Sequence, residues 1–187
     1  MVKKWLGVSC LCIVFFVACQ ARNDQQLNPD ELDKIDVQQT VDEVANEEFS
    51  FHVETEKATY HSDEAIILEA EITNTTDDTI TLTHSATAIN FNIEEKIRGY
   101  TIPYAVHEIG LTTELAPGES IVERYEKSGG YAEEDDDFYQ AFMKGFLDKE
   151  GFPIGYYLVH AETDFYVKER DEYVNLQATV DFIVSDE

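Results

Sequence analysis

From Phe49 to the C-terminus, apolar and polar residues alternate in short runs, which is the pattern of half-buried β-strands. The turns between these runs have their own chemistry, with Asn and Asp at residues 74–78 and Pro-Gly at residues 117–118. The pattern lacks any alternation of strands with long helices, so it predicts an all-β fold, an immunoglobulin-like antiparallel β-sandwich. The predicted strands cover residues 49–54, 65–73, 80–82, 89–93, 121–125, 155–162 and 174–184.

One segment, residues 128–153, departs from the alternation and is predicted to be an insertion in the sandwich. Glu133 to Asp137 form an acidic run, followed by an apolar run with aromatic residues four apart. Because carboxylates stabilise the N-terminus of a helix, we expect one short helix from about Asp137 to Asp148. Its aromatic face either covers an open part of the sandwich or binds a partner. The residues that would make a partner contact are Phe138, Phe142, Met143 and Phe146.

The N-terminal residues have the layout of an export signal. Lys3 and Lys4 precede an apolar run from Trp5 to Ala18 that is too short to span a bilayer comfortably. The Phe-Val-Ala-Cys sequence that ends at Cys19 resembles the lipobox of bacterial lipoproteins. The resemblance implies that residues 1–18 are a cleaved signal peptide and that acylated Cys19 anchors the protein in the bilayer, on the extracytoplasmic face of the cell membrane. An ordinary secretory signal cleaved after Ala18 and an uncleaved anchor are the alternatives.

Residues 19–47 are predicted to be a flexible acidic tether. They are rich in Gln, Asn, Asp and Glu, and their apolar residues are too sparse to close a core. A coil of this length reaches about 30 Å. The tether therefore leads into one sandwich domain, residues 48–187.

The net charge disfavours one class of partner, nucleic acid, and the cysteine content bears on whether disulfides stabilise the domain. The chain of 187 residues has a formal net charge of −26, which repels nucleic acid and disfavours a nucleic-acid partner. Its three cysteines are Cys10 and Cys12 in the signal and Cys19 at the predicted acylation site. No disulfide can form within one mature chain, so the core must stabilise the domain alone.

We find no pattern of residues that predicts an enzyme, a cofactor or a metal site. The five histidines are not at metal-ligand spacing, and the Gly-Glu-Ser at residues 118–120 lacks the second glycine of a nucleophile elbow. Two alternatives stay open. The acidic run at residues 133–137 could bind a divalent cation or a small solute, and a dispersed carboxylate pair of a cell-envelope hydrolase could be present among the 39 acidic residues.

Several of these segments, taken in order, resemble the BsuPI-type intracellular proteinase inhibitor domain. They are the strand at 66–72, the turn at 74–76, the strand at 89–93, the Leu-Ala-Pro-Gly-Glu-Ser motif at 115–120 and the strand from Gly155. The resemblance covers roughly residues 48–165. It implies a sandwich fold and a non-catalytic module that binds a protein partner at the cell surface, with a protease as one candidate. The chain has no tryptophan between Tyr104 and Leu115 and adds the insertion at 128–153, so no reactive-site residue is carried over.

Overall fold

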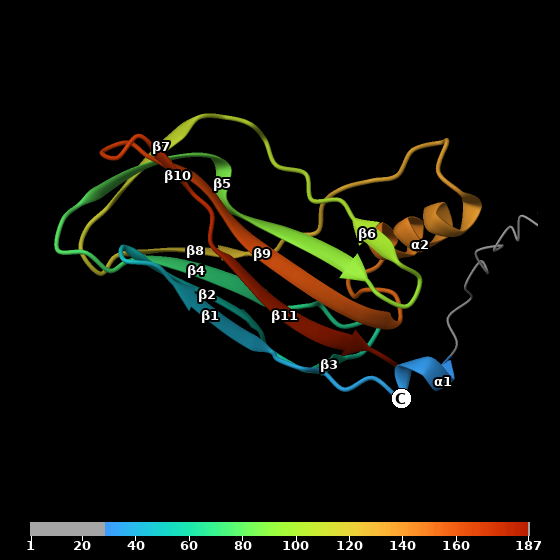
Figure 1. Cartoon of the computed structure of the whole chain (residues 1–187). Coiled ribbons are helices and arrows are strands. Elements are labelled where there is room, and N and C mark those ends of the chain that lie inside the picture. Colours follow the sequence, from blue (N-terminus) through green and yellow to red (C-terminus); the bar gives the residue numbers. More distant parts are fainter. Residues whose placement is uncertain (1–28, 187) are drawn as a thin grey trace, which may run out of the picture.

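The computed structural model describes residues 29–186 (Figure 1). The predicted signal peptide, Cys19 and the first part of the predicted tether lie outside these described residues. The described chain begins with the short helix α1 (Pro29–Leu32) and ends just after the last strand, β11 (Gln177–Val184).

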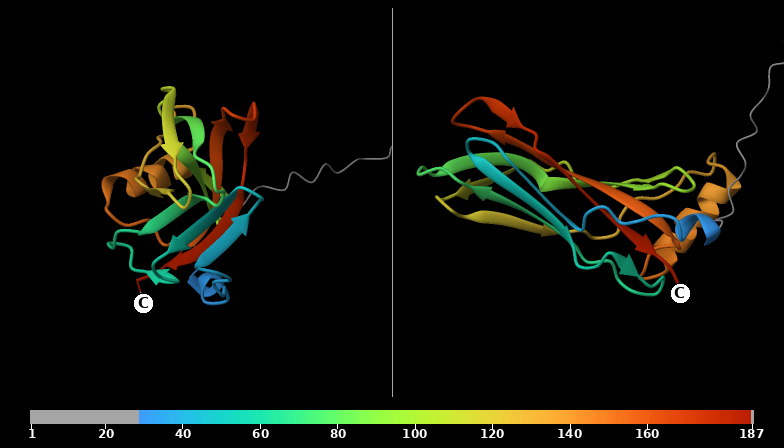
Figure 2. Two further views of the ribbon diagram at one scale, coloured as in Figure 1. Left: turned by 90° about the vertical axis from the view of Figure 1, so that its left-hand side faces the viewer. Right: turned by 60° about the horizontal axis from the view of Figure 1, so that its bottom comes forward.

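Two sheets packed face to face make up the domain (Figure 2). Within the described residues the first sheet has the strand order β1-β2-β4-β8, and the second has the order β3-β11-β9-β5-β6, with β7 paired to β5 and β10 paired to β9. Their bounds are β1 (Val41–Ala45), β2 (Phe49–Thr55), β3 (Thr59–Tyr60), β4 (Leu68–Asn74), β5 (Ile80–Glu95), β6 (Tyr100–Ile102), β7 (Leu111–Leu115), β8 (Ser120–Arg124), β9 (Gly155–Val167), β10 (Glu172–Val174) and β11.

The order of the longer strands is that of an immunoglobulin-like sandwich, which confirms the predicted fold. Strands β2, β4 and β8 correspond to A, B and E, and they face β11, β9 and β5, which correspond to G, F and C. These six strands pair antiparallel within their sheets, whereas the short β3 lies parallel to β11. The predicted insertion falls in the connection between E and F, from β8 to β9.

Alternating side chains from both sheets fill the space between them. In β4, Leu68, Ala70 and Ile72 are buried while their neighbours are partly exposed. Aromatic rings contribute much of the core, and the rings of Phe49 and Phe165 meet across the sheets edge to face at 5.3 Å. Each fully buried side chain of this size stabilises the fold by about 1.5–3 kcal/mol.

The domain begins earlier than the sequence indicates. The tether was expected to extend through residue 47, but Val41–Ala45 form β1, which pairs antiparallel with β2. Just before β1, the backbone N–H groups of Gln38 and Gln39 donate to the buried carboxylate of Asp181, each at 2.8 Å. The Tyr156 hydroxyl donates to the same carboxylate at 2.9 Å, and burial raises the pKa of Tyr156 to about 12. Asp181 therefore fastens the start of the domain to the second sheet.

Helix α2 (Asp137–Asp148) lies within the insertion and confirms the predicted helix. It begins where expected because Asp136 Oδ1 accepts from the backbone N–H groups of Phe138 at 3.0 Å and Tyr139 at 2.9 Å. Its buried side chains are Phe142, Met143 and Phe146.

Lys127 fastens the other end of α2. Its Nζ donates to the backbone carbonyl oxygens of Phe146 at 2.8 Å and Lys149 at 3.1 Å, and to that of Gly151. Nζ also lies over the rings of Phe146 and Phe152, 4.5 and 4.9 Å from their centres. Burial lowers the pKa of Lys127 to about 8, and the nearby carboxylate of Glu150 partly opposes this shift. The rings of Phe146 and Phe152 also stabilise the charged form. One lysine at the base of the insertion thus binds the helix C-terminus, where cations are stabilising.

The sandwich has two distinct ends (Figures 1 and 2). We call one the α2 end, because α2, α1 and the end of β11 lie there. We call the other the far end, where β7 and the β9–β10 hairpin lie. Val41, the first residue of β1, pairs with Glu54 near the end of β2. Residues 29–40 therefore lie toward the α2 end, and the chain enters the sandwich there (Figure 1).

Candidate functional site

The four residues predicted to bind a partner lie on α2, and three of them pack into the domain. Phe142, Met143 and Phe146 are buried, and only Phe138 is accessible, with 52% of its surface exposed. The Phe142 ring packs 5.1 Å from that of Tyr100, and the Phe146 ring packs 4.8 Å from that of Phe152. In this arrangement the aromatic face of α2 covers one end of the sandwich.

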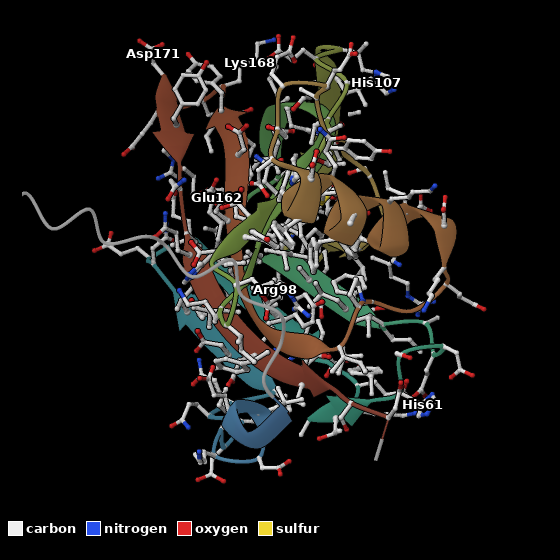
Figure 3. The ribbon with its side chains drawn as sticks, turned by 90° about the vertical axis from the view of Figure 1, so that its right-hand side faces the viewer. His61, Arg98, His107, Glu162, Lys168 and Asp171 are labelled. Atoms are coloured by element: carbon white, nitrogen blue, oxygen red, sulfur yellow. The ribbon has the colours of Figure 1, made fainter. Side chains whose placement is uncertain are left out.

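A buried ion pair lies beside the helix. The carboxylate of Glu95 is fully buried and lies 3.4 Å from Nη1 of Arg98. It also accepts from the backbone N–H of Arg98 at 2.7 Å, and the guanidinium lies over the ring of Phe142 at 5.5 Å. Figure 3, which views the α2 end, shows Arg98 next to the helix. Displacing α2 would remove the contact between the Arg98 guanidinium and the Phe142 ring.

Two residues of the acidic run before α2, Asp135 and Asp136, accept hydrogen bonds from backbone N–H groups. Asp135 Oδ2 accepts from the N–H of Ala132 at 2.7 Å, and Asp136 caps the helix. Among the described residues, no three His, Cys, Asp or Glu side chains are grouped so that they could hold a metal ion.

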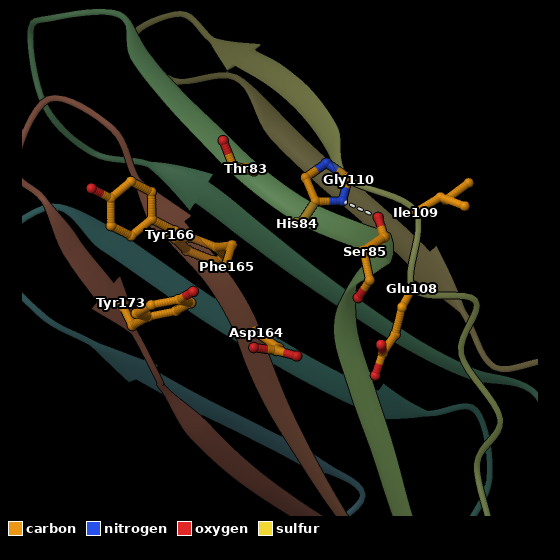
Figure 4. A pocket seen from close by; sticks show the side chains of 10 residues that line it. All are labelled: Thr83, His84, Ser85, Glu108, Ile109, Gly110, Asp164, Phe165, Tyr166 and Tyr173. Carbon is orange, nitrogen blue, oxygen red and sulfur yellow. Dashed lines mark hydrogen bonds between the residues drawn. The ribbon is translucent and has the colours of Figure 1, made fainter.

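A groove of about 390 Å³ lies toward the far end, on the second sheet (Figure 4). Its floor comes from β5, one wall from β9 and β10, and the other from the connection that leads into β7. We call it the far-end groove, and it is lined by Thr83, His84, Ser85, Glu108, Ile109, Gly110, Asp164, Phe165, Tyr166 and Tyr173.

An irregularity in β5 positions the groove. The register of β5 against β9 shifts between His84 and Ile89. A bulge of this kind redirects side chains and interrupts pairing. The backbone N–H of Ala86, in the irregular stretch, donates to the carbonyl of His107 at 3.0 Å. This bond holds the 103–110 connection against β5, so Glu108 and Ile109 form a wall of the groove.

His84, on the floor, uses both ring nitrogens within the domain. Nδ1 lies 2.8 Å from the carbonyl oxygen of Ser85, and Nε2 lies 2.9 Å from Thr113 Oγ1. Since a carbonyl only accepts, Nδ1 carries a proton, and the Thr113 hydroxyl can donate to a neutral Nε2. The imidazole is thereby oriented by the domain, which leaves it without a ring nitrogen free to act as a base toward a ligand.

The wall of the groove formed by β9 and β10 is aromatic. Tyr166 on β9 and Tyr173 on β10 are directly paired, and their rings meet edge to face at 5.3 Å. The Tyr166 hydroxyl donates to the Asp171 carboxylate in the hairpin turn, which fixes the ring. Tyr173 is 75% exposed, so a ring face is available to a ligand.

Beyond the groove, Glu123 on β8 points between the sheets. Its Oε1 accepts from the backbone N–H of Ala88 at 2.7 Å, so it links the two sheets at the β5 irregularity. Its Oε2 is buried without a hydrogen-bond partner among the described residues. Burial raises the pKa of Glu123, and the hydrogen bond from Ala88 partly opposes this shift. We interpret Glu123 as a structural link.

The groove residues were not identified from the sequence as a site. Tyr166 and Tyr173 flank the Lys-Glu-Arg-Asp turn at 168–171, and Glu108 lies in the irregular stretch between Pro103 and Gly110. Polar turns and irregular stretches are common, and nothing in their sequence places the two segments together. The useful signal would have been two tyrosines on either side of a short polar turn, which a hairpin brings onto one face.

Comparisons with known proteins identify no family or function. No protein-family model and no curated protein matches the chain. A β-glucosidase from Erythrobacter marinus aligns with 72% of this chain at 16% identity and a TM-score of 0.36, and the match spans 15% of that protein. A protein from Archaeoglobus fulgidus aligns with 80% of this chain and 98% of its own at 10% identity and a TM-score of 0.35. These TM-scores are too low to carry an argument about this chain.

Neither helix within residues 29–186 is long and apolar enough to cross a bilayer.

Proposed function

We propose that this protein is a lipid-anchored extracytoplasmic lipoprotein whose sandwich is a non-catalytic protein-binding module, with the far-end groove as its binding site. The anchor is proposed on the sequence of residues 1–19, in which two lysines, a short apolar run and Phe-Val-Ala-Cys occur in lipoprotein order. Two or more acyl chains on Cys19 would give firm membrane attachment where one gives only marginal binding.

The observation that carries this proposal is the position of the groove relative to the start of the domain. The described chain begins at the α2 end, and the groove lies toward the opposite end (Figure 1). A domain tethered through its N-terminus would therefore have the groove at the end remote from its point of attachment. That orientation suits a module that meets a partner at the cell surface.

The groove itself has features of a recognition surface. It combines an exposed aromatic wall, the exposed apolar side chain of Ile109 and two exposed carboxylates, Glu108 and Asp164. Aromatic anchors with a polar surround are typical of protein interfaces. A protease remains one candidate partner, as the resemblance to the BsuPI-type domain implies.

The two carboxylates make a cell-envelope hydrolase a second candidate function. A glycosidase uses a pair of acids, one of them usually in a buried environment that keeps it protonated. Glu108 and Asp164 are both exposed, which favours binding over catalysis. Replacement of both by their amides would abolish any hydrolase activity, and activity that survived the double replacement would eliminate this candidate site.

The anchor is tested by fatty-acid labelling in a bacterial host. We expect the wild-type protein to take up labelled palmitate and fractionate with membranes, and Cys19→Ser to do neither. Labelling of the Cys19→Ser variant at the wild-type level would contradict acylation at this residue.

The binding module is tested by crosslinked pull-downs from native membranes with quantitative mass spectrometry. We expect Tyr173→Ala to lose a specific partner that the matched variant Tyr131→Ala retains, because Tyr131 is exposed but lies beside α2. Equal recovery with both variants would exclude the groove, and loss only with Phe138→Ala would assign binding to the helix instead. Recovered proteases are then assayed for inhibition by the purified domain.

A further inference from the structure

The far-end groove carries negative charge without a cation to balance it. Its lining contains Glu108 and Asp164 and no lysine or arginine. None of the ion pairs among residues 29–186 includes either carboxylate. The contact that Asp164 makes is with the neutral amide of Asn90, at 3.4 Å. Both carboxylates therefore remain able to bind a cation from outside the chain.

The aromatic wall is also suited to binding a cationic group. A guanidinium or ammonium attracted to a carboxylate is further stabilised when it lies over the face of a tyrosine ring. Tyr166 and Tyr173 lie on the same side of the groove as Asp164, while Glu108 extends from the opposite wall (Figure 4). A cationic side chain between the walls would meet carboxylates from both sides and a ring face from one.

The surroundings indicate a peptide rather than a free cation. Ile109, on the wall that leads into β7, is exposed. This apolar side chain could contact a residue next to a bound basic residue. The chain as a whole is strongly acidic, with a net charge of −26, which attracts a basic segment over distances up to about 10 Å.

We propose that the far-end groove binds an arginine or lysine side chain from an extended segment of a partner protein, with apolar residues beside it. This inference rests on the proposed protein-binding function and specifies the chemistry of the partner.

The test is selection of a displayed library of random ten-residue peptides on the purified full-length protein, at about 0.15 M salt to screen weak surface attraction. The groove variant is Glu108→Gln with Asp164→Asn. The control variant is Glu133→Gln with Glu134→Gln, which removes the same charge from exposed residues near α2. Circular dichroism verifies that both variants fold.

We expect peptides enriched in arginine or lysine at one position, with apolar neighbours. Their affinity should fall at least tenfold for the groove variant and less than twofold for the control. Citrulline, the neutral analogue of arginine, should lose binding to a similar extent when placed at that position. Absence of basic enrichment, equal loss in both variants, or full binding of the citrulline peptide would overturn the inference.

The outcomes also separate this inference from the proposed function. If Tyr173→Ala loses a membrane partner but the selection shows no basic preference, the binding module stands and its cationic specificity is wrong. If neither experiment depends on the groove, the proposed binding function of the groove fails as well.

Discussion

The contacts of Lys127 predict a large effect from a single change outside the sandwich core. Lys127→Met retains the aliphatic chain and removes the ammonium group. The carbonyl oxygens of Phe146, Lys149 and Gly151 would lose their shared donor, and two aromatic rings would lose their cation. Hydrogen bonds to a charged group contribute about 1.5–3 kcal/mol each. Part of this sum is offset because the buried ammonium has lost hydration, as the lowered pKa indicates.

We therefore expect Lys127→Met to lower the free energy of unfolding by about 2–3 kcal/mol. Because the lost bonds lie at the C-terminus of α2, hydrogen exchange should accelerate first over residues 137–148. Urea unfolding and peptide-resolved exchange measure the two effects.

Lys144→Met is the matched control, since it makes the same change of charge at an exposed position on the same helix. It should alter the free energy of unfolding by less than about 0.5 kcal/mol. If the two variants have equal stability and equal exchange over α2, the ammonium of Lys127 does not hold the helix and the reasoning is refuted.

Three further predictions concern other single positions. Asp181→Ala should leave two backbone N–H groups and the Tyr156 hydroxyl without their acceptor. It should lower the free energy of unfolding by about 2–4 kcal/mol and accelerate hydrogen exchange over residues 38–45. Unchanged hydrogen exchange there would contradict the role of Asp181 in holding the start of the domain. Because burial raises the pKa of Glu123, the folded protein holds this proton to higher pH than the unfolded chain does. The stability of the wild type relative to Glu123→Gln should therefore fall as the pH rises above about 4.5, as measured by paired urea titrations. A rise in relative stability would refute the assignment. Gly151→Ala would place a Cβ 2.3 Å from a backbone oxygen of the β3–β4 connection and should lower the melting temperature. Gly145→Ala on α2 would add a Cβ that meets no atom within 4 Å beyond its chain neighbours and the helix backbone, so it should raise stability by up to about 1 kcal/mol. A reversed order would contradict both expectations.

The sandwich and its helix could be predicted because local rules specify them. Alternation with a period of two matches the pleat of a strand whatever its partner, and it identified β2, β4, β9 and β11. The Pro-Gly turn also follows local chemistry, since Gly118 adopts a φ of 73° and Glu119 donates to the carbonyl of Ala116 at 2.9 Å. Asp136 caps α2 because a short acceptor lies directly before its first turn.

The start of the domain could not be predicted in this way. In β1 only alternate residues are partly buried, and acidic residues contribute two of its five side chains, so its composition resembles that of a tether. What makes it a strand is pairing with β2 and the bonds to Asp181, which lies 143 residues from Gln38 in the sequence. These contacts also determine at which end the chain enters the sandwich.

The strand pattern, the turns, the helix with its cap and the acidic charge follow from neighbouring residues or from composition, and the lipid anchor is predicted on the same local grounds. Only the folded chain shows that α2 covers one end and that Tyr173, Asp164 and Glu108 share a groove toward the other. The two walls of that groove come from segments more than 50 residues apart in the chain, and the shift in β5 that aligns them is visible only once β5 pairs with β9. Side chains that far apart in sequence are brought together by the register of the sheet, which no local pattern records.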